Sequence, residues 1–187
     1  VIRTFDDVDR LRTAKAERAG LPAWDPSSEA YVFFTSGSTG TPRGVSITRA
    51  GLDKFIQAFV DRTRQHSTPL IAPLFGSLAF DITVNMLFAP ILAGGALITF
   101  DGHSADAVVR IAKSPSLTWL VATPSHLQML VRLLPKDHGL RTIISGGDAL
   151  SASLAKALVD SNPVATFLEI NEADGTFARG FHIGSEL

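Results

Sequence analysis

A loop rich in glycine and hydroxyl side chains is the segment of this sequence best suited to chemistry. Residues 35–44 read Thr-Ser-Gly-Ser-Thr-Gly-Thr-Pro-Arg-Gly and directly follow the apolar run 31–34. Glycines let the backbone approach a ligand closely, and backbone N–H groups and hydroxyls can converge on phosphate oxygens. Arg43 adds a guanidinium that can hold a phosphate with two hydrogen bonds. The loop therefore predicts a phosphate-binding site, with a flexible surface turn as the alternative.

This loop is not a Walker phosphate loop. That pattern needs a lysine and a Ser or Thr directly after the second of two spaced glycines, and no lysine lies between Lys15 and Lys54. A different phosphate-binding arrangement is therefore expected.

Asp81 is the second candidate, because it follows the apolar residues 78–80. An Asp at the start of a helix is commonly an N-cap. On the residues alone, capping of the helix that follows is therefore one expected role for Asp81.

Other polar residues show no catalytic or metal-binding pattern. The histidines at 66, 103, 126, 138 and 182 are scattered, without the spacing of metal ligands, so surface or capping roles are expected. Asp25, Asp106 and Asp148 are expected in loops or caps, and no Ser-His-Asp grouping is visible.

Composition narrows the class of protein. The chain has 187 residues, 45% hydrophobic and 19% charged, with a formal net charge of -1 and no cysteine. The hydrophobic and charged fractions fit a globular protein with a hydrophobic core. The lack of cysteine excludes thiolate catalysis and thiolate metal sites. The near-zero net charge argues against a surface that binds nucleic acid or an anionic membrane. The charged start, which begins at Val1, shows no signal peptide. We expect a cytoplasmic protein.

Hydrophobic periodicity predicts alternating strands and helices. Strand-like runs fall at 31–35, 70–74, 96–100, 118–122, 140–144 and 164–168, and helical patterns at 5–17, 52–60, 81–92, 105–112, 123–134 and 154–158. Thr123 is expected to cap the helix that has Pro124 in its first turn. The run 31–35 is predicted to be a buried strand. The apolar stretch 86–100 is predicted to be a buried helix followed by a buried strand. Alternation of this kind predicts an α/β fold with a mostly parallel sheet flanked by helices, which binds ligands at the carboxyl ends of its strands.

Residues 31–45, Tyr-Val-Phe-Phe-Thr-Ser-Gly-Ser-Thr-Gly-Thr-Pro-Arg-Gly-Val, resemble the phosphate-loop signature of adenylate-forming (AMP-binding) enzymes. This superfamily contains acyl-CoA synthetases, luciferases and the amino-acid adenylation domains of nonribosomal peptide synthetases. Arg43 stands where the family usually has lysine, and the charge is kept. The resemblance implies that the β- and γ-phosphates of ATP are bound by Thr35, Ser36, Gly37, Ser38, Thr39, Gly40 and Arg43.

Three further segments resemble the substrate-binding segments of peptide-synthetase adenylation domains. They are 78–83 with the residues that follow it to 95, then 121–125, and 143–150. By this resemblance Asp81 pairs with the α-ammonium of an amino acid. The side-chain pocket is lined by Ile82, Asn85, Val121, Ile144 and Gly146. It is partly apolar, with one amide, and ordinary core packing is the alternative for Ile82, Val121 and Ile144.

The resemblance divides the chain into three parts. Residues 1–28 are a helix and connector, 29–168 part of the large subdomain of an adenylation domain, and 169–187 a divergent tail whose residues 179–183 resemble the hinge to the small subdomain. The family's adenine- and magnesium-placing segment, its ribose-binding Asp and its catalytic lysine are absent, so no catalytic residue is assigned.

The expected function is part of an amino-acid adenylation domain. With ATP and Mg²⁺, such a domain converts an amino acid to an aminoacyl-adenylate and passes it to a carrier-protein thiol, beside neighbouring synthetase domains. This segment alone is expected to be inactive. The alternatives are a degenerate adenylation-like scaffold or interaction module, and an acyl-CoA-ligase-like fragment that uses a non-amino acid.

Overall fold

A parallel sheet forms the centre of the molecule in the computed structural model, which describes residues 25–35, 42–63, 69–100, 105–135, 138–161 and 165–170. The expected helix 5–17 and the tail beyond residue 170 lie outside these ranges. The five strands are β3 (Ile71–Leu74), β4 (Ala96–Thr99), β5 (Trp119–Ala122), β6 (Thr142–Gly146) and β7 (Thr166–Ile170). The expected α/β class with a mostly parallel sheet is confirmed.

Backbone pairing sets the order of the strands. β3 pairs in parallel with β4, and β6 pairs in parallel with both β5 and β7. Thr118, directly before β5, joins the two groups: its backbone N donates to the carbonyl of Ile71 over 3.0 Å, and its hydroxyl accepts from the N–H of Ile71 over 2.9 Å. The strands therefore lie in the order β4-β3-β5-β6-β7.

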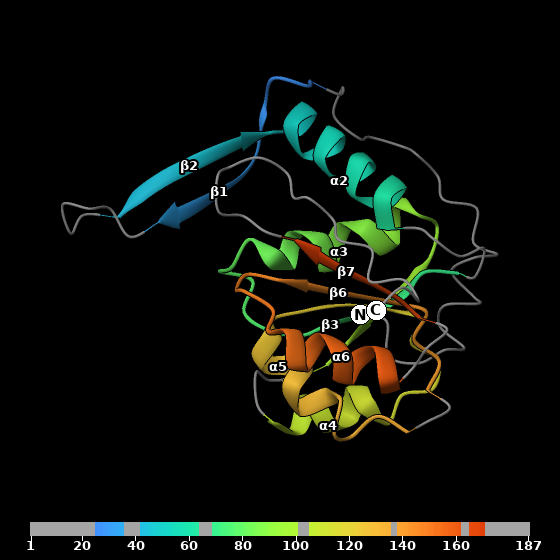
Figure 1. Cartoon of the computed structure of the whole chain (residues 1–187). Coiled ribbons are helices and arrows are strands. Elements are labelled where there is room, and N and C mark those ends of the chain that lie inside the picture. Colours follow the sequence, from blue (N-terminus) through green and yellow to red (C-terminus); the bar gives the residue numbers. More distant parts are fainter. Residues whose placement is uncertain are drawn as a thin grey trace.

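Helices cover both faces of this sheet, which explains why its central strands β5 and β6 are buried throughout. The helices α2 (Arg49–Thr63) and α3 (Ile82–Leu92) lie over one face, and α4 (Ala105–Ala112), α5 (Pro124–Leu130) and α6 (Ala152–Ser161) lie over the other (Figure 1). Every residue of β5 and β6 is buried. Within the described residues, no helix has the length and apolar composition that crossing a membrane requires.

The alternation of side chains along β6 determines which residues face which helices. Ile143 and Ser145 line a small cavity together with side chains of α5 and α6. Ile144 and Gly146 therefore face the layer of α2 and α3. Val121 is paired with Ile144 in the β5–β6 register, so it faces the same layer.

A two-stranded antiparallel ribbon projects from this body (Figure 1). It consists of β1 (Glu29–Thr35) and β2 (Arg43–Thr48). The expectation of a buried strand at 31–35 is wrong, because Val32 is 39% exposed and Phe34 is 71% exposed. The reason is that β1 pairs with β2, a strand that the sequence analysis did not predict, and no described residue covers the outer side of the ribbon.

The ends of several elements differ from the sequence-based expectation. α5 ends at Leu130 rather than near 134, and β6 and β7 each begin two residues later than expected. The interior Pro90 does not break α3, whose C-terminal carbonyls are capped instead: the N–H of Gly95 donates to the carbonyl of Pro90 over 2.8 Å.

Candidate functional site

Asp81 is the N-cap of α3. Its carboxylate Oδ1 accepts a hydrogen bond from the N–H of Ile82 over 2.8 Å, and the side chain is exposed. Among the described residues, no hydrogen bond or ion pair involves the second oxygen. One oxygen thus has the capping role, and the other is open to accept from a ligand.

Tyr31 connects the ribbon to this carboxylate. Burial raises the pKa of the Tyr31 hydroxyl, and the negative charge of Asp81 raises it further. The inner face of β1 therefore lies within electrostatic reach of the start of α3.

Ile82, Thr123 and Gly147 form one wall at the carboxyl edge of the sheet. Thr123 directly follows β5 and Gly147 directly follows β6. An idealised Cβ on Gly147 would lie 3.7 Å from Cγ2 of Thr123 and 3.9 Å from Cδ1 of Ile82. Gly147 also has a φ of 81°, which favours glycine. The start of α3 therefore contacts the ends of two central strands.

The other expected substrate residues lie deeper in the same layer. Val121 and Ile144 are 1% and 0% exposed and face α2 and α3 from paired positions of the sheet, while Gly146 ends β6 on that face. Asn85 is 6% exposed on α3, and its carbonyl oxygen has no hydrogen-bond partner. The structure thus brings these four residues and Ile82 to one side of the sheet.

The expected phosphate loop falls mostly outside the described residues. Ser36, Gly37, Ser38, Thr39 and Gly40 are among those not described. Thr35 ends β1 and Arg43 begins β2, and the two are paired across the ribbon. The loop therefore leaves and re-enters the ribbon at one end, with the exposed Arg43 side chain beside it.

His126 is a site residue that the sequence analysis missed. Its Nδ1 lies 2.8 Å from the hydroxyl of Thr123, and its ring contacts Phe75 edge-to-face at 5.3 Å between centroids. Burial lowers the pKa of His126, so the neutral imidazole is favoured. Phe75 follows β3 and Thr123 follows β5, so His126 lies at the same carboxyl edge.

The Thr123 hydroxyl does not do what the sequence predicted. Thr123 is the N-cap residue of α5, with Pro124 in the first turn, but its side chain makes no capping hydrogen bond to the helix. The hydroxyl lies instead beside His126 Nδ1 and, at 3.0 Å, beside the hydroxyl of Ser125. His126 Nδ1 and the Ser125 hydroxyl, rather than a backbone N–H of the first turn, are therefore the partners of the Thr123 hydroxyl.

His138, Asp25 and Asp148 each accept hydrogen bonds from residues that are near them in the sequence. The expected surface or capping role is wrong for His138, which is buried and whose Nδ1 accepts from the N–H of Leu140 over 3.3 Å in a segment outside any helix. Asp25 accepts from the N–H and hydroxyl of Ser27, and Asp148 accepts from the N–H of Ala149. Both aspartates are loop residues, as expected.

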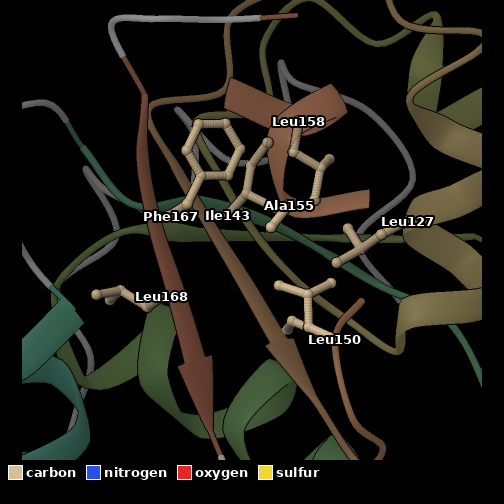
Figure 2. Close-up of a pocket in the computed structure, with 8 residues that line it drawn as sticks. Leu127, Ile143, Leu150, Ala155, Leu158, Phe167 and Leu168 are labelled. Carbon is tan, nitrogen blue, oxygen red and sulfur yellow. The ribbon is translucent and has the colours of Figure 1, made fainter. Parts of the chain in front are cut away.

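A small cavity on the opposite face of the sheet is separate from this candidate site (Figure 2). It measures about 10 Å³, room for at most one water molecule. The Ser145 hydroxyl on its wall is buried without a hydrogen-bond partner. The residues that line it are apolar apart from Ser145: Leu127, Ile143, Leu150, Ala155, Leu158, Phe167 and Leu168. The cavity is too small for an amino acid.

No metal site is assigned from these residues. Among those that the structure describes, no three His, Asp or Glu side chains come together. The implied magnesium ion therefore has no ligands that can be named in this part of the chain.

Comparison with known proteins identifies the family. The model of the AMP-binding enzyme family matches residues 3–170. Tyrocidine synthase 3 of Brevibacillus parabrevis is 32% identical over 74% of this chain, bacitracin synthase 3 of Bacillus licheniformis 33% over 74%, and phenyloxazoline synthase MbtB of Mycobacterium tuberculosis 31% over 90%. The chain spans only 2%, 2% and 12% of the lengths of these relatives.

Solved structures agree at the level of the fold. PA1221, a nonribosomal peptide synthetase protein containing adenylation and PCP domains, superposes with a TM-score of 0.74 at 22% identity, over 94% of this chain and 36% of that chain. The N-terminal subdomain of Klebsiella oxytoca NpsA, bound to anthranilyl-AMSN, gives 0.72 at 18% identity, over 97% and 48%. Sequence match and fold together show that this chain belongs to the AMP-binding enzyme family, as a partial subdomain related to the adenylation domains of nonribosomal peptide synthetases.

Proposed function

We propose that this chain is part of an amino-acid adenylation domain. Such a domain activates an amino acid with ATP and transfers it to a carrier-protein thiol. Residues 29–168 would be the partial large subdomain, and residues 169–187 would lead toward the hinge. Neighbouring synthetase domains and a carrier protein are the proposed partners, supported by relatives such as PA1221, in which an adenylation domain accompanies a PCP domain.

The geometry at Asp81 carries this proposal. One carboxylate oxygen is fixed by the first N–H of α3, so the open oxygen has a defined direction. In the same layer lie the apolar side chains of Ile82, Val121 and Ile144, the proposed side-chain pocket, with Val121 and Ile144 buried in the core. A carboxylate at the mouth of an apolar layer fits a zwitterion, because it pairs with the α-ammonium while the side chain is removed from water.

The ribbon supports the ATP part of the proposal. Thr35 and Arg43 flank a loop of hydroxyls and glycines, which is a donor set that suits polyphosphate oxygens. The negative charge of Asp81 helps to raise the pKa of the Tyr31 hydroxyl on β1. We therefore propose that Thr35, Ser36, Gly37, Ser38, Thr39, Gly40 and Arg43 bind the β- and γ-phosphates of ATP.

The proposed reaction needs positioning more than a protein nucleophile. The carboxylate of the amino acid attacks the α-phosphate of ATP and pyrophosphate leaves. Arg43 and the loop amides stabilise negative charge on the departing phosphates. Asp81 fixes the ammonium and thereby orients the carboxylate of the same substrate. We expect pyrophosphate exchange by the 187-residue chain alone to stay near background, so binding is the informative measurement.

The test is calorimetric binding to the 187-residue chain. A panel of amino acids is compared with the same acids lacking the α-amino group. We expect at least about tenfold tighter binding of the amino acids, equivalent to about 1.4 kcal/mol. Asp81→Asn should remove that difference, because the isosteric amide has no charge to pair with the ammonium. Asp106→Asn, an exposed carboxylate on α4, is the matched control and should change nothing.

The outcomes separate the alternatives. Equal binding of amino acids and deaminated acids, unaffected by Asp81→Asn, would support the acyl-CoA-ligase-like fragment. No binding of any carboxylic acid would contradict the adenylation proposal and favour the degenerate scaffold or interaction module.

A further inference from the structure

His126 is held by two contacts at the carboxyl edge of the sheet. Its Nδ1 lies 2.8 Å from the Thr123 hydroxyl, and its ring meets that of Phe75 edge-to-face with 5.3 Å between the centroids. Phe75 follows β3 and Thr123 follows β5, so the imidazole joins the ends of two neighbouring strands. The two contacts therefore restrain the ring from two sides.

The Thr123 side chain presents different groups to different sides. Its hydroxyl lies beside His126 Nδ1 and, at 3.0 Å, beside the Ser125 hydroxyl. Its methyl group Cγ2 lies 3.7 Å from an idealised Cβ on Gly147, with Cδ1 of Ile82 at 3.9 Å from the same point. Because one Cβ carries both the hydroxyl and the methyl group, a single χ1 angle sets both positions. The interactions that hold the hydroxyl therefore also hold the methyl group in the wall formed with Ile82 and Gly147.

This wall borders the carboxylate on which the proposed function depends. Ile82 directly follows Asp81, and its N–H donates to Asp81 Oδ1 over 2.8 Å. In another χ1 rotamer of Thr123, the hydroxyl would take the place of the methyl group beside Ile82. That exchange would put a polar group into an apolar wall next to the proposed amino-acid site, where it would need a new hydrogen-bond partner.

We propose that His126 is a positioning residue of the amino-acid site: through its hydrogen bond with Thr123 it holds the wall beside Asp81 in place. This inference rests on the proposed function, because the wall affects binding only if an amino acid is held at Asp81. Burial lowers the pKa of His126 and favours the neutral imidazole. The neutral ring can pair with the hydroxyl as acceptor or as donor, depending on its tautomer.

Two substitutions separate the hydrogen bond of His126 from its ring. His126→Phe keeps a ring against Phe75 and loses the hydrogen bond, whereas His126→Asn keeps a polar atom near the position of Nδ1 and loses the ring. Calorimetry with the 187-residue chain measures binding of the amino-acid panel. We expect His126→Phe to weaken binding about three- to tenfold, as for one lost hydrogen bond, and His126→Asn to recover most of that loss. Gln128→Ala, at an exposed position of α5, is the control and should bind as the wild type does.

A double-mutant cycle tests whether the effect passes through Thr123. Thr123→Val keeps a methyl group for the wall and removes the hydroxyl. If His126 acts by holding that hydroxyl, His126→Phe should weaken binding in the wild-type background and make little further difference beside Thr123→Val. A full effect of His126→Phe in both backgrounds would overturn the inference.

A further measurement needs no amino acid. Nitrogen NMR of the histidine rings reports hydrogen bonding at Nδ1, and the His126 signal is the one that His126→Phe removes. Thr123→Val should shift that signal, and an unchanged signal would overturn the inference. Amino-acid binding that requires Asp81 but is unaffected by His126→Phe would overturn this inference alone. Absence of all amino-acid binding would overturn the proposed function as well.

Discussion

β1 of the ribbon and β5 of the parallel sheet both contain a continuous apolar run, and they reach opposite outcomes. β5 and β6 are buried along their whole length. In the ribbon, five of the six residues of β2 are exposed, and so is Phe34 on β1. The sheet has helices over both faces, whereas the described residues cover only the inner side of the ribbon.

The comparison teaches that an apolar strand sequence favours burial of that strand but does not predict which other elements will cover it. The proposed site would use both regions, with the proposed substrate residues on the sheet and α3 and the proposed phosphate-binding residues Thr35 and Arg43 on the ribbon. Substitutions in the sheet should therefore act on folding, and substitutions on the outer side of the ribbon should act on association. Four predictions test this division.

Leu120→Ala should give the largest effect. Leu120 is fully buried at the centre of β5, and truncation there loses apolar contact and leaves a cavity. We expect the free energy of unfolding to fall by about 2–5 kcal/mol, measured by urea denaturation. Leu78→Ala, at a position 63% exposed, is the matched control and should stay within about 0.5 kcal/mol. Equal losses at the two positions would contradict the division.

Gly95→Ala tests the join between β3 and β4. A Cβ there would lie 1.9 Å from the backbone carbonyl oxygen of Leu70, which accepts the hydrogen bond from the N–H of Ala96. Backbone must move, so we expect a loss of about 1–3 kcal/mol in the same denaturation assay. Gly51→Ala on α2 is the control, with the nearest atom at 3.3 Å, and should be neutral or stabilising because alanine favours helices.

Much of this architecture could be predicted from the sequence, because periodicity reports local structure. The helix after Asp81 and the alternation of strands and helices were both visible. β2 was missed because its signal is alternation rather than a continuous apolar run: Val45 and Ile47 alternate with Gly44, Ser46 and Thr48. The Thr123 hydroxyl was assigned to capping because its competing partner, His126, is identified only by side-chain geometry.

The candidate site was partly visible for the same reason. A resemblance could place Asn85 in a pocket, but its unpaired oxygen depends on how α3 packs on the sheet. Likewise His126 looked like one scattered histidine, and its contact with Phe75 joins residues 51 positions apart in the chain. Such tertiary relations leave no periodic signal.

His126→Gln should have a smaller effect than the two substitutions above, and the effect should appear in the pH dependence of the free energy of unfolding. Burial lowers the pKa of His126 in the folded state, so below the ordinary value of about 6.5 the unfolded chain binds more protons. The free energy of unfolding should therefore fall as the pH drops below about 6.5. Glutamine cannot titrate, so the variant should show a shallower fall between about pH 7.5 and 5. Parallel curves for the two proteins would contradict the buried, neutral histidine.

Phe34→Ser should have the smallest effect on stability and a visible effect on association. The ring is 71% exposed on the outer side of the ribbon, so little burial is lost and the free energy of unfolding should change by less than about 0.5 kcal/mol. Exposed apolar side chains on an uncovered ribbon favour contact between molecules. Light scattering at rising concentration should therefore show less self-association for the variant.

Phe33→Ser is the matched comparison, because Phe33 packs edge-to-face on Tyr31 at 5.1 Å between ring centroids on the inner side. That variant should lose stability. Equal behaviour of the two would mean that the two sides of the ribbon are not distinct.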